Sequence, residues 1–133
     1  MKEILFICTH NSARSQMAEA LVNANLSSKY KAYSAGTTAT KINPHVIKAL
    51  NEIGIDTSKQ WSKNINEFKA KKFDVVVTVC DHAKETCPFF PAEKVIHKSF
   101  ADPSKFKGTE EQIMQQVRQV RQEIKEWVTK TFQ

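Results

Sequence analysis

Two short apolar runs constrain the fold of this chain more than any other feature of its sequence. They are residues 2–7 (KEILFI) and residues 73–79 (FDVVVTV), and the second is rich in β-branched side chains. Apolar runs of this length are typical of strands that are buried on both faces of a parallel sheet. We therefore expect two central strands here, with the shorter and more polar stretches 30–34 and 94–97 as strands beside them.

Helical patterns separate these runs. They span residues 15–26, residues 44–53, which begin with proline and are followed by glycine, and the shorter stretch 65–71. Thr109 and Gln112 then form a capping-box pattern. Apolar residues recur after them on one helical face, namely Ile113, Val117, Val120, Ile124, Trp127 and Val128. This alternation predicts an α/β fold, a three-layer sandwich with a four-stranded parallel sheet and right-handed crossovers.

Length and charge narrow the function classes. A chain of 133 residues with 41% hydrophobic content suits one core, so we expect a single domain over residues 1–133. No stretch approaches the ~18 apolar residues of a membrane span, and residues 1–7 are too short for a signal peptide, so we expect a cytoplasmic protein. The net charge of +6 favours anionic partners. Nucleic acid is not expected, because no basic run is interleaved with aromatic residues.

The strongest local signal is the segment from Cys8 to Arg14. Five residues separate this cysteine and arginine, between a predicted strand and a predicted helix. In such a loop, backbone N–H groups and the dipole of the following helix bind a tetrahedral anion. We therefore predict an oxyanion site formed by the loop residues, which are Thr9, His10, Asn11, Ser12, Ala13 and Arg14.

Cys8 is the expected nucleophile of this site. Thiol pKa values fall from about 8.5 to roughly 3.5–7.5 at helix N-termini, so Cys8 should be largely thiolate. We expect Arg14 to grip two oxygens of the anion in its planar fork and to stabilise the charge that develops there. Ser15 is expected to donate a hydrogen bond to the thiolate, and Asn11 to hold the loop in a left-handed turn.

An aspartate and two further cysteines are expected near this loop. Ligands of doubly wound sheets bind beyond the carboxyl ends of the strands, so Cys8, Cys80 and Asp102 should converge there. Asp102 is a candidate general acid, although an aspartate before proline is more often a turn former. Together with Cys87 the cysteines are odd in number, which argues against a static disulfide framework. Their spacing matches no common zinc pattern, so we expect no metal.

Several segments resemble a known family. The strand, the C-x5-R-S loop and the late Asp-Pro are similar to the low-molecular-weight tyrosine phosphatases over nearly the whole chain. A narrower resemblance is to the thioredoxin-coupled arsenate reductases of that superfamily. It rests on four stretches, CTHNSARSQMAEA from Cys8, YSAGT from Tyr33, VVTVCDHAKETCP from Val76 and FADP from Phe100. The resemblance implies the low-molecular-weight phosphatase fold and an enzyme that reduces arsenate to arsenite for arsenic detoxification.

The resemblance also implies a relay of three cysteines. Cys8 attacks arsenate, Arg14 and the loop hold the oxyanion, and Asp102 assists the departure of water. Cys80 then attacks Cys8 and releases arsenite, and Cys87 attacks Cys80 to leave a disulfide that thioredoxin reduces. Because thioredoxin supplies the electrons, no resident cofactor is expected. We expect a monomer.

Two other function classes remain open. A phosphomonoester hydrolase of the tyrosine phosphatase type would use Cys8, Arg14 and Asp102 through a phosphocysteine, without the later cysteines. Such enzymes usually carry aromatic residues around the site, whereas the Asp-Pro pair here is followed by Ser104 and Lys105. An oxyanion-binding or redox-sensing module is the non-catalytic alternative.

The chain departs from its relatives near the loop. Some relatives bind a potassium ion there through residues that resemble Asn11, Glu19 and Ser34. Trp61 and Lys63 stand where two further oxygen ligands would be. Since a lysine ammonium could replace the cation, we expect little potassium dependence.

Overall fold

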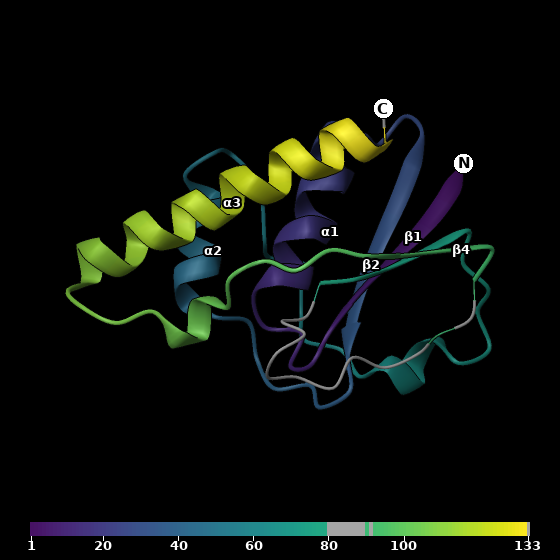
Figure 1. The fold of residues 1–133 in the computed structure, drawn as a ribbon, viewed down its shortest axis with the longest axis horizontal. Coiled ribbons are helices and arrows are strands. Elements are labelled where there is room, and N and C mark those ends of the chain that lie inside the picture. Colours follow the sequence, from purple (N-terminus) through teal and green to yellow (C-terminus); the bar gives the residue numbers. More distant parts are fainter. Residues whose placement is uncertain (80–89, 91, 133) are drawn as a thin grey trace.

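The structure, a computed structural model, describes residues 1–79, 90 and 92–132 (Figure 1). Its centre is a sheet of four strands, β1 (Lys2–Cys8), β2 (Tyr30–Gly36), β3 (Val75–Thr78) and β4 (Lys94–His97). All neighbouring strands are parallel and their order is β2-β1-β3-β4. The two most apolar strands are therefore central and the more polar ones form the edges, as the sequence predicts. The carboxyl ends of the strands lie along one edge of the sheet.

Three α-helices pack on one face of the sheet. They are α1 (Arg14–Asn25), α2 (Pro44–Asn51) and α3 (Glu110–Phe132), and Figure 1 shows the long helix α3 running along the other two. Side chains of β1 that point to this face, such as Ile4 and Phe6, are fully buried against the helices. None of the helices in the described part of the chain is long and apolar enough to span a membrane.

The opposite face of the sheet is covered by aromatic side chains. Tyr33, Phe68, Phe73 and Phe90 form a row of edge-to-face contacts with ring centroids 5.5–5.9 Å apart. Phe68 belongs to a short 3-10 helix, η1 (Ile65–Phe68). Together with buried Leu5 and Ile7 of β1, this row forms a second, smaller core. The chain therefore has the predicted α/β architecture, with a sheet between two layers.

The expected helix over residues 65–71 is wrong in type and length. Its two large apolar residues, Ile65 and Phe68, are three positions apart. This spacing places both on one side of a 3-10 turn, and the structure has such a turn, which ends at Phe68. A longer helical pattern predicts its helix more closely. The helix predicted over residues 15–26 is present over Arg14–Asn25.

The final helix begins and packs nearly as the sequence predicts. Thr109 Oγ1 accepts from the Gln112 N–H at 3.2 Å, and Gln112 Oε1 accepts from the Thr109 N–H at 2.9 Å, which is the capping box. Ile113 and Trp127 are only partly buried. The buried residues of α3 are Met114, Val117, Val120, Ile124, Val128 and Phe132. The buried face of α3 therefore differs from the predicted one, because it includes Met114 and Phe132 in place of Ile113 and Trp127.

A carboxylate links α2 to α3. The Glu52 carboxylate accepts from Arg118 Nε at 3.0 Å, from Arg118 Nη2 at 2.7 Å and from Arg121 Nη1 at 3.1 Å. Arg121 Nη1 also donates to the Ala49 carbonyl at 2.6 Å, which is a free acceptor at the end of α2. The bonds from Arg118, and then those from Arg121, lower the pKa of Glu52 to about 2.

This depressed pKa predicts how α2–α3 packing depends on pH. The stabilising contribution of Glu52 is present above its ordinary pKa of 4.5 and is lost as the pH falls through about 2. We expect Glu52→Gln to lower the midpoint of thermal unfolding at pH 7, and the difference from the native chain to shrink as the pH falls from 4.5 toward 2. A difference that stays constant over this range would contradict the assignment.

Candidate active site

The loop between β1 and α1 has its carbonyl groups turned outward. The carbonyls of four consecutive residues, Thr9, His10, Asn11 and Ser12, each accept a hydrogen bond from outside the loop. The donors are Thr38 N at 2.9 Å, Thr40 N at 3.3 Å with Ser62 Oγ at 2.9 Å, Gln16 Nε2 at 3.1 Å and Asn43 N at 2.9 Å, in that order. The loop is thus anchored to several separate segments of the chain.

This arrangement aims the N–H groups of the loop inward. In a trans peptide the carbonyl of one residue and the N–H of the next point in opposite directions, and the loop contains no cis peptide. The outward carbonyls of residues 9–12 therefore direct the N–H groups of residues 10–13 toward the centre of the loop. One of them, the N–H of Asn11, donates to Cys8 Sγ at 3.2 Å. Such a concave row of N–H groups binds anions.

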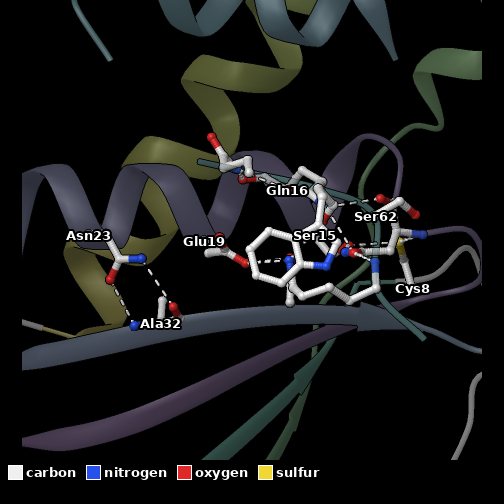
Figure 2. A network of polar contacts seen from close by, with 12 residues as sticks. Cys8, Ser15, Gln16, Glu19, Asn23, Ala32 and Ser62 are labelled. Atoms are coloured by element: carbon white, nitrogen blue, oxygen red, sulfur yellow. Dashed lines mark hydrogen bonds and ion pairs between the residues drawn. The ribbon is translucent and has the colours of Figure 1, made fainter. Parts of the chain in front are cut away.

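Cys8 lies at the base of this concave row. It is the last residue of β1, is 3% exposed, and has Ser15 Oγ at 2.9 Å from its sulfur. Asn11 has φ 51°, so the left-handed turn expected there is confirmed. The predicted contact between Ser15 and Cys8 is also present (Figure 2). The sulfur therefore faces two groups that can donate to a thiolate.

Arg14, at the end of the loop, lies beside Asp102. Arg14 is the first residue of α1, and its guanidinium is buried, with Nη1 3.5 Å from the Phe100 carbonyl. Nη2 lies 3.6 Å from Asp102 Oδ2. The other oxygen, Asp102 Oδ1, accepts from both N and Oγ of Ser104. Asp102 is thus a turn former, as expected for an aspartate before proline, and also a partner of Arg14.

A buried lysine lies beside the loop. Lys63 is 4% exposed, and its Nζ donates to the Trp61 carbonyl at 2.8 Å and lies 3.5 Å from Glu19 Oε1. The Trp61 ring covers the ammonium, with 4.6 Å between Nζ and the ring centroid. Ser34 Oγ donates to Glu19 at 2.6 Å. The ammonium therefore lies against Glu19, as the sequence suggested.

Burial has the larger effect on Glu19. It raises the pKa of this carboxyl, while Lys63 and Ser34 act in the opposite direction. Removal of Lys63 would leave a buried carboxylate without its countercharge. The Lys63 side chain thus favours the charged form of the Glu19 carboxyl, against the effect of burial.

Two residues that sequence reasoning missed connect these groups. Gln16 is fully buried and its Nε2 donates to Asn11 Oδ1 at 2.8 Å, and Gln60 Nε2 donates to Gln16 Oε1 at 3.0 Å. The available signal was a polar side chain on the first turn of α1, next to Ser15 and toward the core. Cys80 and Cys87 lie outside the described residues.

Gly36 allows the loop to approach the sheet. It is paired with Cys8 at the end of β2. A Cβ atom at this position would lie 2.5 Å from the Thr9 carbonyl oxygen, 2.9 Å from Asn11 N and 3.0 Å from the Cys8 carbonyl oxygen. All three are backbone atoms of the loop, so the loop itself would have to move.

We therefore expect Gly36→Ala to weaken the binding of inorganic phosphate, measured by isothermal titration calorimetry, by about 10–100-fold, because displacement of the loop would cost at least one hydrogen bond to the charged ligand, worth about 1.5–3 kcal/mol. Gly54→Ala is a matched control. Gly54 has φ 82° and no atom within 4 Å of the added Cβ, so that variant should lose stability but keep its phosphate affinity. Unchanged phosphate binding by Gly36→Ala would contradict the assigned role.

Comparison with known proteins agrees with this geometry. The model of the family described as low molecular weight phosphotyrosine protein phosphatase matches residues 3–133. A protein of Halalkalibacterium halodurans named arsenate reductase is 46% identical over 132 residues, which are 98% of this chain and 94% of that protein.

Solved structures give the same result. One described as an arsenate reductase in the phosphate binding state superposes with a TM-score of 0.83 at 31% identity, and covers 98% of this chain and 96% of its own. The Corynebacterium glutamicum thioredoxin-dependent arsenate reductase superposes with a TM-score of 0.66 at 25% identity over 98% of this chain and 63% of its own. The match over residues 3–133 and the 46% identity over nearly the whole chain show that the chain belongs to the low molecular weight phosphotyrosine protein phosphatase family.

Proposed function

We propose that this protein is an arsenate reductase in which Cys8 is the nucleophile and thioredoxin the final reductant. The observation that carries the proposal is the position of the Cys8 sulfur at the base of a row of inward N–H groups, in a loop that ends at Arg14 and its partner Asp102. Arsenate is a tetrahedral oxyanion, and its arsenic would lie above the sulfur when its oxygens occupy the loop. The relatives named arsenate reductase support this substrate.

The first chemical step forms a bond between Cys8 and arsenic. The Cys8 thiolate attacks As(V), and one arsenate oxygen leaves as water after it gains protons. Asp102, 3.6 Å from the Arg14 guanidinium, acts as the acid that delivers a proton to the leaving oxygen. Arg14 and the loop N–H groups stabilise the charge on the remaining oxygens. Ser15 Oγ and the Asn11 N–H contact the sulfur before the attack.

The later steps require the other two cysteines. The Cys80 thiolate attacks the Cys8 sulfur, forms a Cys8–Cys80 disulfide and releases arsenite, so the two electrons of the sulfur–arsenic bond reduce As(V) to As(III). Cys87 then attacks Cys80, which frees the Cys8 thiolate and forms a Cys80–Cys87 disulfide. Thioredoxin reduces that disulfide. The relative described as thioredoxin-dependent supports this choice of reductant.

An assay of turnover tests the proposal. Arsenate-dependent NADPH oxidation is measured with thioredoxin and thioredoxin reductase, for the native chain, Cys8→Ser and Cys87→Ser. We expect Cys8→Ser to lose at least ~10³-fold in rate, because it lacks the nucleophile. Cys87→Ser should release about one equivalent of arsenite per chain and then stop, because its relay ends at the Cys8–Cys80 disulfide.

Other outcomes would identify other functions. Repeated turnover by Cys87→Ser would show that the relay is wrong. Hydrolysis of an aryl phosphate by the native chain, without any arsenate-dependent NADPH oxidation, would make the protein a phosphatase. Absence of both reactions, with phosphate still bound, would indicate an oxyanion-binding module.

The buried ammonium of Lys63 predicts the effect of potassium on this assay. Because Nζ already lies 3.5 Å from Glu19, a second cation beside it would meet like charge. We expect the rate to be the same in potassium and sodium salts at equal ionic strength. A gain of several fold on the addition of potassium would contradict this expectation.

A further inference from the structure

The side-chain amides of Asn11, Gln16 and Gln60 form a hydrogen-bonded series, in which Asn11 and Gln16 are buried and Gln60 is partly buried. Figure 2 shows Gln16 beside Ser15. Gln16, with no exposed surface, places its Nε2 3.1 Å from the Asn11 carbonyl, 2.8 Å from Asn11 Oδ1 and 2.9 Å from the Trp61 carbonyl. Its Oε1 accepts from Gln60 Nε2 at 3.0 Å, and Gln60 Nε2 also lies 3.2 Å from the Gln16 carbonyl. No step of the proposed reaction uses these amides directly.

Backbone groups fix the orientation of the side-chain amides of Asn11 and Gln16. The N–H of Lys63 lies 2.7 Å from the Asn11 side chain, and because an N–H only donates, the atom facing it must be the oxygen Oδ1. The carbonyls of Asn11 and Trp61 only accept, so Gln16 must present its NH₂ group to them. The same NH₂ group then donates to Asn11 Oδ1. A half-turn of either side-chain amide would place an NH₂ group against an N–H donor, or an amide oxygen against a carbonyl oxygen.

The fixed orientation of Asn11 determines the direction of the next two hydrogen bonds. With Oδ1 held by Lys63 and Gln16, Asn11 presents Nδ2 to Ser15 Oγ at 2.8 Å. Ser15 Oγ therefore accepts from Asn11, and its single hydrogen remains for the Cys8 sulfur at 2.9 Å. A hydroxyl that donates to the sulfur stabilises the thiolate rather than the thiol.

We propose that Gln16 is a positioning residue for the nucleophile. By holding the Asn11 amide in one orientation, it directs the Ser15 hydroxyl hydrogen to the Cys8 sulfur, where that hydrogen stabilises negative charge. Gln60 supports Gln16 through its Oε1. The inference rests on the proposed function in taking Cys8 as the nucleophile. It does not depend on arsenate being the substrate.

Glutamine is suited to this position by its two donor hydrogens. Its NH₂ group faces three acceptors, all within 3.1 Å. A glutamate there would place a carboxylate against the same three oxygens. A methionine has nearly the same length and shape but no donor, so Gln16→Met removes the hydrogen bonds and leaves most of the packing.

The test measures the reactivity of Cys8 alone. In a Cys80→Ser/Cys87→Ser background, Cys8 is the only cysteine, and the rate of its alkylation by iodoacetamide is followed as a function of pH. We expect Gln16→Met to raise the pH midpoint of alkylation by about one unit, which slows the reaction about tenfold at low pH. The rate at high pH should be unchanged, because the thiol is ionised there in both proteins.

Gln115→Met is the matched control, because Gln115 is exposed on α3. It should leave the midpoint unchanged. If Gln16→Met does not fold, as judged by thermal unfolding, Gln60→Met should raise the midpoint in the same direction by a smaller amount. Midpoints of Gln16→Met and Gln60→Met that both equal the control would overturn the proposal.

A double-mutant cycle separates positioning from a general loss of structure. Ser15→Ala removes the hydroxyl through which Gln16 is proposed to act, so it should raise the midpoint on its own. In the Ser15→Ala background, Gln16→Met should then add little. Fully additive shifts would show that Gln16 does not act through Ser15. Since alkylation needs no arsenate, a native chain that fails to reduce arsenate would refute the proposed function but not this inference.

Discussion

The structure depends on one constraint, which is that a peptide loop can surround an anion only if its carbonyl oxygens are turned away from it. Four consecutive carbonyls of the loop find outside donors, and these donors come from residues 16, 38–43 and 62. The parallel register places Cys8 beside Gly36, where the missing Cβ gives the loop room to turn. The shape of the loop therefore depends on the sheet and on the segments that donate to its carbonyls, and not on the residues of the loop alone.

Much of this arrangement could be predicted from the sequence. The runs 2–7 and 73–79 identified the central strands because continuous apolar stretches have few other places in a small α/β protein. Cys8, Arg14 and Ser15 followed from one short motif between a strand and a helix, where spacing and local geometry are tightly coupled. Asp102 was correctly placed near Arg14 by the general rule that the carboxyl ends of parallel strands share an edge.

The groups that sequence reasoning missed are held by contacts between distant segments. Gln16 and Gln60 are 44 positions apart, and nothing in either local sequence indicates that their amides meet. The orientation of Asn11 depends on the backbone N–H of Lys63, and a backbone group has no sequence signature. The stretch 65–71 was assigned a longer helix because two apolar residues three apart fit an α-helix and a 3-10 turn equally well. Such short patterns need tertiary packing to decide between them.

The donors that hold the loop in shape come from several distant parts of the chain. The segments that hold the loop open extend from residue 16 to residue 63, so the loop takes its shape only where that part of the chain has come together. Without these segments Cys8 would lack the positioned Asn11 N–H and Ser15 hydroxyl as partners of its sulfur. Damage to the packing of any segment between residues 16 and 63 would therefore reach the surroundings of Cys8, even where that segment contains no residue that touches the sulfur.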